Sequence, residues 1–297
     1  MPLSAFAAAK VNLYLQLTGR RGDGYHLLDS LVVFPSIGDR LSVSPGQSLE
    51  LVLEGPQAQS LAASGGENLV LAAARALARH AGIAAKARFV LEKNLPVASG
   101  LGGGSSDAAA ALRLLVRHWR LSIGENALAA LGATLGADVP ASLYARPVWV
   151  GGIGEKLKPA AGLPQGGILL ANPAKALPTA QVYAARSGRF SKKGRFRRMP
   201  RDVFALAETL ASRRNDLTEA AQGLLPEIAS VLARLSSLEG ALLARMSGSG
   251  ATCFALFADR LAAERASRAL SLLEPTWWCA AGSLCPEPLA QGPCAPG

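Results

Sequence analysis

Alternating apolar and polar residues predict a β-strand over residues 10–17, near the start of the chain. Successive side chains of a strand point to opposite faces, so this segment has one aliphatic face and one more polar face. The aliphatic face holds Val11, Leu13, Leu15 and Leu17, and the other holds Lys10, Asn12, Tyr14 and Gln16. Short apolar runs predict further strands at residues 31–34, 49–53, 87–92, 147–150 and 168–171.

Helices are predicted between these strands, where apolar residues recur every three or four positions. Asn68 can cap a helix that runs to about His80 and stops at Gly82. Further helices are expected from Ser105 to about His118, near 126–135, and at 202–213, 226–238 and 259–273. A strand–turn–strand unit is expected at 241–257, and one more strand should follow the last helix.

The order of these elements predicts the fold class. Strands and helices mix without a regular strand–helix–strand rhythm, which indicates an α+β fold in two domains. A Gly- and Pro-rich segment at 151–166 indicates a linker or domain edge. We therefore expect an N-terminal domain over residues 1–158, a C-terminal domain over 159–285 and a flexible tail over 286–297.

Composition narrows the class of protein. Half of the 297 residues are hydrophobic, but no run of about 18 apolar residues is present, which argues against a membrane span. The N-terminus lacks the basic start and the cleavage pattern of a signal peptide, so we expect a cytoplasmic protein. The four cysteines form no Cys-x-x-Cys pair and the histidines lie elsewhere, so we expect free or buried thiols and no zinc site.

The formal net charge of +10 comes mainly from one segment. Eight of the 31 lysines and arginines lie between positions 186 and 201 without a single acid, so the rest of the chain is close to neutral. Such a segment is typical of a solvated loop, or it attracts an anionic ligand or a nucleic acid. Only Phe190 and Phe196 interleave with it, which is too few aromatic residues for a platform that stacks single strands.

The glycine-rich segment at residues 96–112 (PVASGLGGGSSDAAAAL) is the most informative part of the chain. A Walker A loop would need a lysine, and a dinucleotide fingerprint would need glycine where Ser105 stands. What remains is a loop whose backbone N–H groups can converge on an anion at a helix N-terminus. Ser105 and Ser106 can bind phosphate oxygens, or they can cap the helix in a simple turn. Four glycines in five positions cost conformational entropy, which favours the ligand.

Two polar constellations lie near the N-terminus. Lys10 and Asn12 share a strand face about 7 Å apart. Next, Asp23 sits between two glycines in a tight turn that presents Tyr25 and His26. An aromatic ring and a histidine on a loop suit a flat heterocycle, although a turn with a half-buried tyrosine is the simpler interpretation.

Asp138 follows Gly136 and precedes Pro140, which suits the first turn of a helix. Its carboxylate can be a helix cap. Alternatively it is a general base that accepts the proton of a substrate hydroxyl, with a lysine nearby. A second glycine-rich turn at residues 246–251 (MSGSGA) is consistent with a hairpin.

Together and in this order, these segments resemble the GHMP kinase superfamily. The P-x-x-x-G-L-G-G-G-S-S-D-A-A run is similar to its phosphate loop. The A-K-x-N-L, D-G-Y-H, L-G-A-D-V-P and M-S-G-S-G-A segments, with N-D-L at 215–217, are similar to its diphosphocytidyl-methylerythritol kinase branch. The chain departs from the pattern at Ala8, where the family usually has proline, and at Thr218, where glutamate is commoner.

The resemblance implies two α+β domains, the first like domain 2 of ribosomal protein S5 and the second ferredoxin-like, with the active site between them. It implies transfer of the ATP γ-phosphate to a hydroxyl of 4-diphosphocytidyl-2-C-methyl-D-erythritol, giving the 2-phosphate, in non-mevalonate isoprenoid precursor biosynthesis. ATP would be the co-substrate with Mg²⁺, for which no protein ligand can be named. Monomers or a weak homodimer are expected, with no nucleic-acid or membrane partner.

Site residues carried over from the resemblance fall into three groups. Asp138 would be the general base and Lys10 its partner. ATP would contact Asn68 and Lys93 through its adenosine, and its phosphates would contact Pro96, Val97, Ala98, Ser99, Gly100, Leu101, Gly102, Gly103, Gly104, Ser105 and Ser106. The substrate would contact Asn12, Tyr25, His26, Thr179 and Tyr183, with the two tyrosines on either side of cytosine. The alternatives are another GHMP kinase, acting on mevalonate, homoserine or a sugar, and a non-catalytic anion or nucleic-acid binder that uses residues 186–201.

Overall fold

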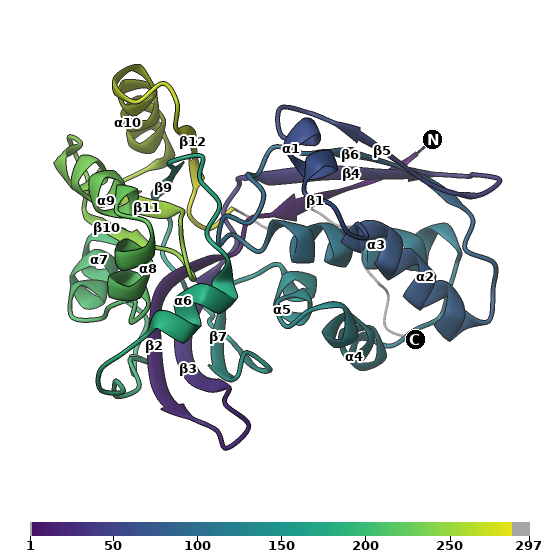
Figure 1. Cartoon of the computed structure of the whole chain (residues 1–297), viewed down its shortest axis with the longest axis horizontal. Helices are drawn as coiled ribbons and strands as arrows, with labels where there is room; N and C mark the ends of the chain where they lie inside the picture. Colours follow the sequence, from purple (N-terminus) through teal and green to yellow (C-terminus); the bar gives the residue numbers. More distant parts are fainter. Residues whose placement is uncertain (1, 287–297) are drawn as a thin grey trace.

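Three four-stranded sheets form the framework of the protein (Figure 1). The computed structural model describes residues 2–286, and ten helices lie in that part of the chain. One sheet and its helices form the lobe on the right of Figure 1, and the sheet with the C-terminal helices lies on the left. The remaining sheet, with the long β2–β3 hairpin, lies between them.

The first sheet has the order β1-β4-β6-β5. Only the β5–β6 pair is parallel. Its strands are β1 (Leu3–Ala8), β4 (Gly38–Ser44), β5 (Leu49–Glu54) and β6 (Ala87–Glu92). The helices of this lobe are α1 (Ala58–Ala63), α2 (Leu69–Ala81), α3 (Gly103–His118), α4 (Glu125–Leu135) and α5 (Val139–Tyr144). Four consecutive alanines, 108–111, are fully buried in α3, so this helix packs closely on the sheet and on α2.

Local signals set the ends of α2 as the sequence predicts. The Asn68 side chain accepts a hydrogen bond from the Val70 N–H, and Gly82 ends the helix in a left-handed conformation. The predicted start of α3, at Ser105, was wrong by two residues. The helix begins at Gly103 after Gly102, and no side chain caps it, so neither Ser105 nor Ser106 is a cap.

The second sheet has the antiparallel order β2-β3-β7-β8. Its strands are β2 (Val11–Arg20), β3 (His26–Val33), β7 (Val148–Gly152) and β8 (Lys156–Pro159). The expectation of a linker at 151–166 was therefore wrong in part, because this segment completes the β7–β8 hairpin. Both faces of β2 are covered, so the polar side chain of Asn12 is buried as well as the aliphatic ones, and so is Lys10 directly before the strand. The division of the chain between residues 158 and 159 stays a prediction.

The third sheet has the antiparallel order β10-β11-β9-β12. Its strands are β9 (Gly167–Asn172), β10 (Leu243–Met246), β11 (Cys253–Phe257) and β12 (Trp278–Ser283). The helices are α6 (Thr179–Ala185), α7 (Val203–Ala211), α8 (Thr218–Leu224), α9 (Glu227–Ser237) and α10 (Arg260–Leu273). Chain order and sheet order together give the split β-α-β-β-α-β arrangement of a ferredoxin-like domain, as expected.

The hydrophobic core continues across the second and third sheets. Leu13 and Leu31 of the second sheet share one buried cluster with Leu170 and Phe254 of the third, while α9 and α10 cover the other face of the third sheet. Burial of this shared apolar surface holds the two parts together. Among the described residues no helix is long and apolar enough to cross a membrane.

The basic segment, the cysteines and the tail are the remaining features that were predicted from the sequence. No helix or strand lies between Arg186 and Asp202, so the basic segment is a loop as predicted. It packs against the β2 strand, where the Ser191 N–H donates to the Leu17 carbonyl at 2.7 Å. Three cysteines are described, and all are free thiols. The expected tail falls almost entirely on residues 287–297, outside the described residues.

Candidate active site

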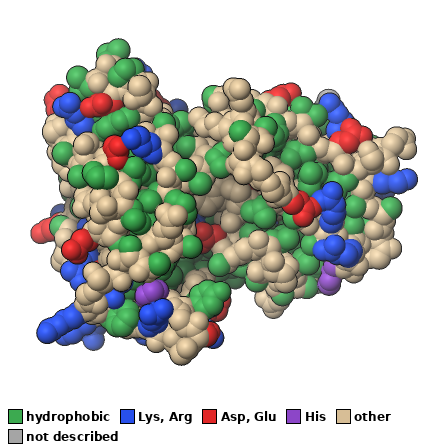
Figure 2. All heavy atoms as spheres, in the orientation of Figure 1, with side chains coloured by type: hydrophobic (Ala, Val, Ile, Leu, Met, Phe, Trp, Pro, Cys, Tyr) green, Lys and Arg blue, Asp and Glu red, His purple; other side chains and the backbone are tan. Residues whose placement is uncertain are grey.

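A cavity of about 950 Å³ opens between the α2–α3 lobe, the β2–β3 hairpin and the C-terminal domain. Figure 2 shows it as a hollow near the centre of the molecule. Eighteen of the twenty residues that the sequence analysis names as site residues line it. The exceptions are Leu101 and Ser106, which are buried. Ser106 instead places its Oγ 3.2 Å from the Ser142 Oγ, so it supports α3 from within.

The phosphate loop, residues 96–106, enters α3 at one wall of this cavity. Gly102 has φ 60°, a conformation that suits glycine, and the first N–H groups of α3 follow it. These N–H groups have no partner within a helix, and together with the helix dipole they favour an anion. A Cβ at Gly100 would lie 2.5 Å from the Gly250 carbonyl oxygen, so only glycine lets the loop touch the turn at 246–251.

Lys10 and Asp138 form an ion pair beside this loop. The Lys10 Nζ lies 2.8 Å from the Asp138 Oδ1, and the Lys10 N–H donates to the Leu101 carbonyl at 2.8 Å. Asp138 precedes α5, but its side chain makes no capping hydrogen bond, so the interpretation as a helix cap was wrong. The Asp138 side chain is 44% exposed, and its Oδ2 lies 3.6 Å from the position that a Cβ on Gly102 would take.

Asn12 sits deeper in the same wall. Its Nδ2 donates to the Ser30 Oγ at 2.8 Å, and the Ser30 hydroxyl donates to the Tyr14 carbonyl at 2.6 Å. These contacts fix the orientation of the amide. The Asn12 Oδ1 is buried and accepts no hydrogen bond within the described structure, so it is available to a ligand that reaches it.

Three aromatic side chains also line the cavity, those of Tyr25, His26 and Tyr183. The His26 ring lies 5.5 Å from the Tyr183 ring and 6.3 Å from the Phe190 ring, while Tyr25 is 62% exposed at the tip of its turn. Burial, together with Arg20 and Arg186, lowers the pKa of His26, so the imidazole is neutral at pH 7. Burial and the charge of Asp138 raise the pKa of Tyr183 to about 12, so its hydroxyl stays protonated.

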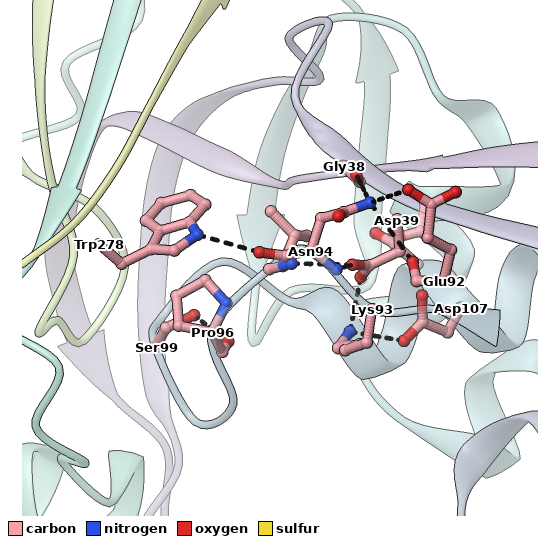
Figure 3. A network of polar contacts seen from close by, with 12 residues as sticks. Gly38, Asp39, Glu92, Lys93, Asn94, Pro96, Ser99, Asp107 and Trp278 are labelled. Carbon is pink, nitrogen blue, oxygen red and sulfur yellow. Dashed lines mark hydrogen bonds and ion pairs between the residues drawn. The ribbon is translucent and has the colours of Figure 1, made fainter. Parts of the chain in front are cut away.

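Lys93 belongs to a buried charge network at the base of the phosphate loop (Figure 3). Its Nζ lies 2.5 Å from the Asp39 Oδ2 and 2.7 Å from the Asp107 Oδ2. Burial alone would lower the pKa of Lys93, but the two carboxylates outweigh it and raise the pKa. Burial raises the pKa of Asp107, and Lys93 offsets this only in part. The Lys93 ammonium is thus neutralised by carboxylates of the protein itself. Its Nζ lies 3.1 Å from the position that a Cβ on Gly103 would take.

Hydrogen bonds from this network reach the C-terminal domain. The Asp39 Oδ1 accepts from the Asn94 N–H at 2.6 Å and from the Leu95 N–H at 2.8 Å. The Trp278 indole N–H of β12 donates to the Asn94 carbonyl at 2.9 Å (Figure 3). The segment that leads into the phosphate loop is therefore held from both sides.

The sequence analysis missed Asp39 and Asp107, and it named the turn at 246–251 without assigning its residues. The Ser249 Oγ lies 2.8 Å from the Thr179 Oγ1, and Gly248 and Ser249 line the cavity. The Asn215 Nδ2 donates to the carbonyls of Met246 and Gly248 at 2.9 and 2.8 Å, so the N-D-L segment supports this turn. In the sequence, the only sign that these residues belong to the site was a short glycine- and serine-rich turn between two predicted strands.

The chain is similar to known proteins in sequence and in fold. Residues 68–146 match the family model for the GHMP kinases N terminal domain, and residues 192–273 match the model for GHMP kinases C terminal. The 4-diphosphocytidyl-2-C-methyl-D-erythritol kinase of Rhodospirillum rubrum is 49% identical over 278 residues, 94% of this chain and 91% of that protein. The enzyme of the same name from Paramagnetospirillum magneticum is 48% identical over 278 residues, with 94% and 97% covered.

A solved structure agrees with these relatives. A crystal structure of a 4-(cytidine 5'-diphospho)-2C-methyl-D-erythritol kinase superposes with a TM-score of 0.78 at 37% identity, covering 96% of this chain and all of that one. Sequence and fold are thus similar along nearly the whole length. The chain belongs to the GHMP kinase family, in its 4-diphosphocytidyl-2-C-methyl-D-erythritol kinase branch, and is an ATP-dependent small-molecule kinase.

Proposed function

We propose that this kinase transfers the γ-phosphate of ATP to the 2-hydroxyl of 4-diphosphocytidyl-2-C-methyl-D-erythritol, a step of non-mevalonate isoprenoid precursor biosynthesis. The observation that carries the proposal is the Lys10–Asp138 pair beside the backbone of the phosphate loop. The relatives whose printed names specify this substrate supply its identity.

Asp138 is the general base in this proposal. Lys10 engages the Asp138 Oδ1, which leaves the Oδ2 for the substrate hydroxyl. The hydroxyl oxygen forms a bond to the γ-phosphorus, the bond between the γ-phosphorus and the bridging oxygen breaks, and the hydroxyl proton passes to the Oδ2. ADP leaves with the electron pair. Positioning and charge stabilisation carry most of phosphoryl transfer, and Lys10 supplies positive charge beside the transferred group.

The phosphates of ATP occupy the phosphate loop, where the free N–H groups of α3 and the helix dipole favour negative charge. Asn68, the Lys93 region, and residues 61–67 at the end of α1 and in the loop after it border the space left for adenosine. The described chain contains no group of three His, Cys, Asp or Glu side chains that could hold a metal ion. Mg²⁺ therefore enters the proposal only as a partner of the ATP phosphates, and we assign it no protein ligand.

The substrate occupies the other end of the cavity. His26 is neutral and can both donate and accept a hydrogen bond, which suits the amino and carbonyl groups of cytosine. Tyr25 and Tyr183 also line the cavity and offer aromatic rings to the base. The unpartnered Asn12 Oδ1 suits a hydroxyl of the polyol, and the Thr179–Ser249 hydroxyls suit the diphosphate.

ADP release from ATP and the cytidyl substrate tests the proposal in wild type and in Asp138→Asn. Asp202→Asn is a matched control, because Asp202 also precedes a helix, is 43% exposed and pairs with a basic residue, Arg201. We expect kcat to fall by at least about a hundred-fold in Asp138→Asn with ATP binding retained, and to stay at the wild-type value in Asp202→Asn. Absence of turnover in folded wild type, with turnover of mevalonate, homoserine or galactose instead, would refute the assigned substrate.

A further inference from the structure

A second cavity, of about 540 Å³, lies in the C-terminal domain. Its walls are the start of the basic loop at 186–189, the connection between α7 and α8 together with the start of α8 at 213–219, and β10. None of its lining residues also lines the catalytic cavity. It is therefore a separate site, and the proposed kinase reaction does not use it.

Positive charge dominates this second cavity. Five arginines line it against two acids, which leaves a formal excess of three positive charges. The arginines are Arg186, Arg189, Arg213, Arg214 and Arg245, and the acids are Asp216 and Glu219. Only one ion pair joins these described side chains, at 2.6 Å between the Arg214 Nε and the Asp216 Oδ1. Basic side chains also gather below α7 and α8 at the lower left of Figure 2.

Arg245 is the deepest of these cations and is only 8% exposed. Its guanidinium donates to the carbonyls of Leu13, Leu210 and Arg213 at 2.7–2.8 Å. Carbonyl oxygens satisfy the N–H groups but do not neutralise the charge. Burial and the neighbouring Arg213 lower the pKa of Arg245 to about 10, which reflects the unfavourable surroundings of this cation. Buried charges in proteins are normally paired with an opposite charge.

Arg213 adds a second cation without a carboxylate. Its Nε donates to the Gly194 carbonyl at 2.9 Å, and its Nη1 donates to the Thr209 carbonyl at 2.5 Å. At the rim, Arg189 is exposed, and the Arg214 side chain is 68% exposed. One buried and one half-buried cation, with two exposed arginines at the rim, are an arrangement that an anion would complete.

We propose that this cavity binds a small phosphorylated anion. Guanidinium groups match the geometry of phosphate oxygens and bind them through charge-assisted hydrogen bonds. The volume is in the range of small-molecule sites. Two of the eight basic residues of the 186–201 segment, Arg186 and Arg189, thereby acquire a role.

Calorimetry with inorganic pyrophosphate tests this site in the full-length enzyme. Saturating ADP and cytidyl substrate first fill the catalytic cavity without allowing turnover. We expect one further pyrophosphate to bind, and we expect Arg189→Gln/Arg214→Gln to weaken it by at least ten-fold. Both arginines are exposed, and Asp216 keeps its bonds from the Leu17 N–H and the Ser191 hydroxyl, so the double variant should fold like wild type.

The matched control is Arg197→Gln/Arg198→Gln, which removes the same charge from exposed positions of the same loop outside the cavity. It should keep pyrophosphate affinity within two-fold of wild type. Equal weakening in both double variants would mean diffuse attraction by the basic loop and would overturn the site, as would the absence of binding. Tighter binding of a single-stranded oligonucleotide, lost in the control variant, would assign the loop to nucleic acid and also overturn the proposal.

Discussion

Alanine at position 102 should impair catalysis far more than stability. Gly102 has φ 60° and ψ 24°, and Gly82 at the end of α2 has almost the same backbone, φ 67° and ψ 29°. A left-handed conformation costs an L-residue about 1–2 kcal/mol. Alanine also reduces the entropy of the unfolded chain, which offsets part of this cost. Gly102→Ala and Gly82→Ala should therefore each lower the free energy of unfolding by about 1 kcal/mol.

The surroundings of the two glycines differ. A Cβ at position 82 would meet no atom within 4 Å. A Cβ at position 102 would lie 3.3 Å from the Lys10 Cβ and 3.6 Å from the Asp138 Oδ2, so Lys10 must move by a few tenths of an ångström. Displacement of reacting groups by about 1 Å can cost roughly a hundred-fold in rate, so we expect kcat to fall about ten-fold in Gly102→Ala.

Thermal unfolding and ADP release in both variants separate the two effects. We expect both variants to melt about 2 °C below wild type, since a loss of about 1 kcal/mol shifts Tm little in a chain of this size. Only Gly102→Ala should lose activity. Wild-type kcat in Gly102→Ala, or an equal loss in Gly82→Ala, would show that the close approach of the loop to the Lys10–Asp138 pair does not matter.

Two further predictions concern pH. The pKa of His26 is lowered below 6.5, so the KM for the cytidyl substrate should stay constant from pH 8 to pH 6.5 and rise only in more acidic buffer; a rise that persists in His26→Gln would contradict this role. Burial raises the pKa of Asp107 above its ordinary 3.8, so the folded state binds this proton more tightly than the unfolded chain. The free energy of unfolding should therefore fall as pH rises through the raised pKa. Urea titrations of Asp107→Asn should lack this pH dependence, and a pH dependence equal to that of wild type would contradict the prediction.

Much of the active site could be predicted because its signals are local. Four glycines in five positions and the helix that follows indicate an anion loop wherever they occur. Asn68 and Gly82 likewise end α2 through bonds to their own neighbours. The strands β1, β4 and β8 were not predicted. For β1 and β4 the reason is that they are defined by pairing with each other, across at least 30 residues of chain, whereas β8 is a four-residue strand at the edge of its sheet.

Asp138 illustrates what the local sequence could not decide. Its position before α5 fits a cap and a base equally well. The ambiguity ends only when β2 brings Lys10, 128 residues away in the chain, to within 2.8 Å of the carboxylate. Lys93 shows a different outcome. The sequence assigned it to ATP, but two carboxylates, from β4 and α3, pair with its ammonium in the interior of the protein.

The sequence by itself determined the fold class, the phosphate loop and the family, because periodicity, glycine spacing and motif order are properties of the chain alone. The tertiary structure decided which polar side chains share a cavity, which of them are neutralised, and which are left with unbalanced charge. Those outcomes depend on distances and burial between distant segments, as in the second cavity, where Arg245 of β10 meets Arg213 of the α7–α8 connection without a carboxylate. Electrostatic energy depends on separation and on the surrounding dielectric, and folding sets both.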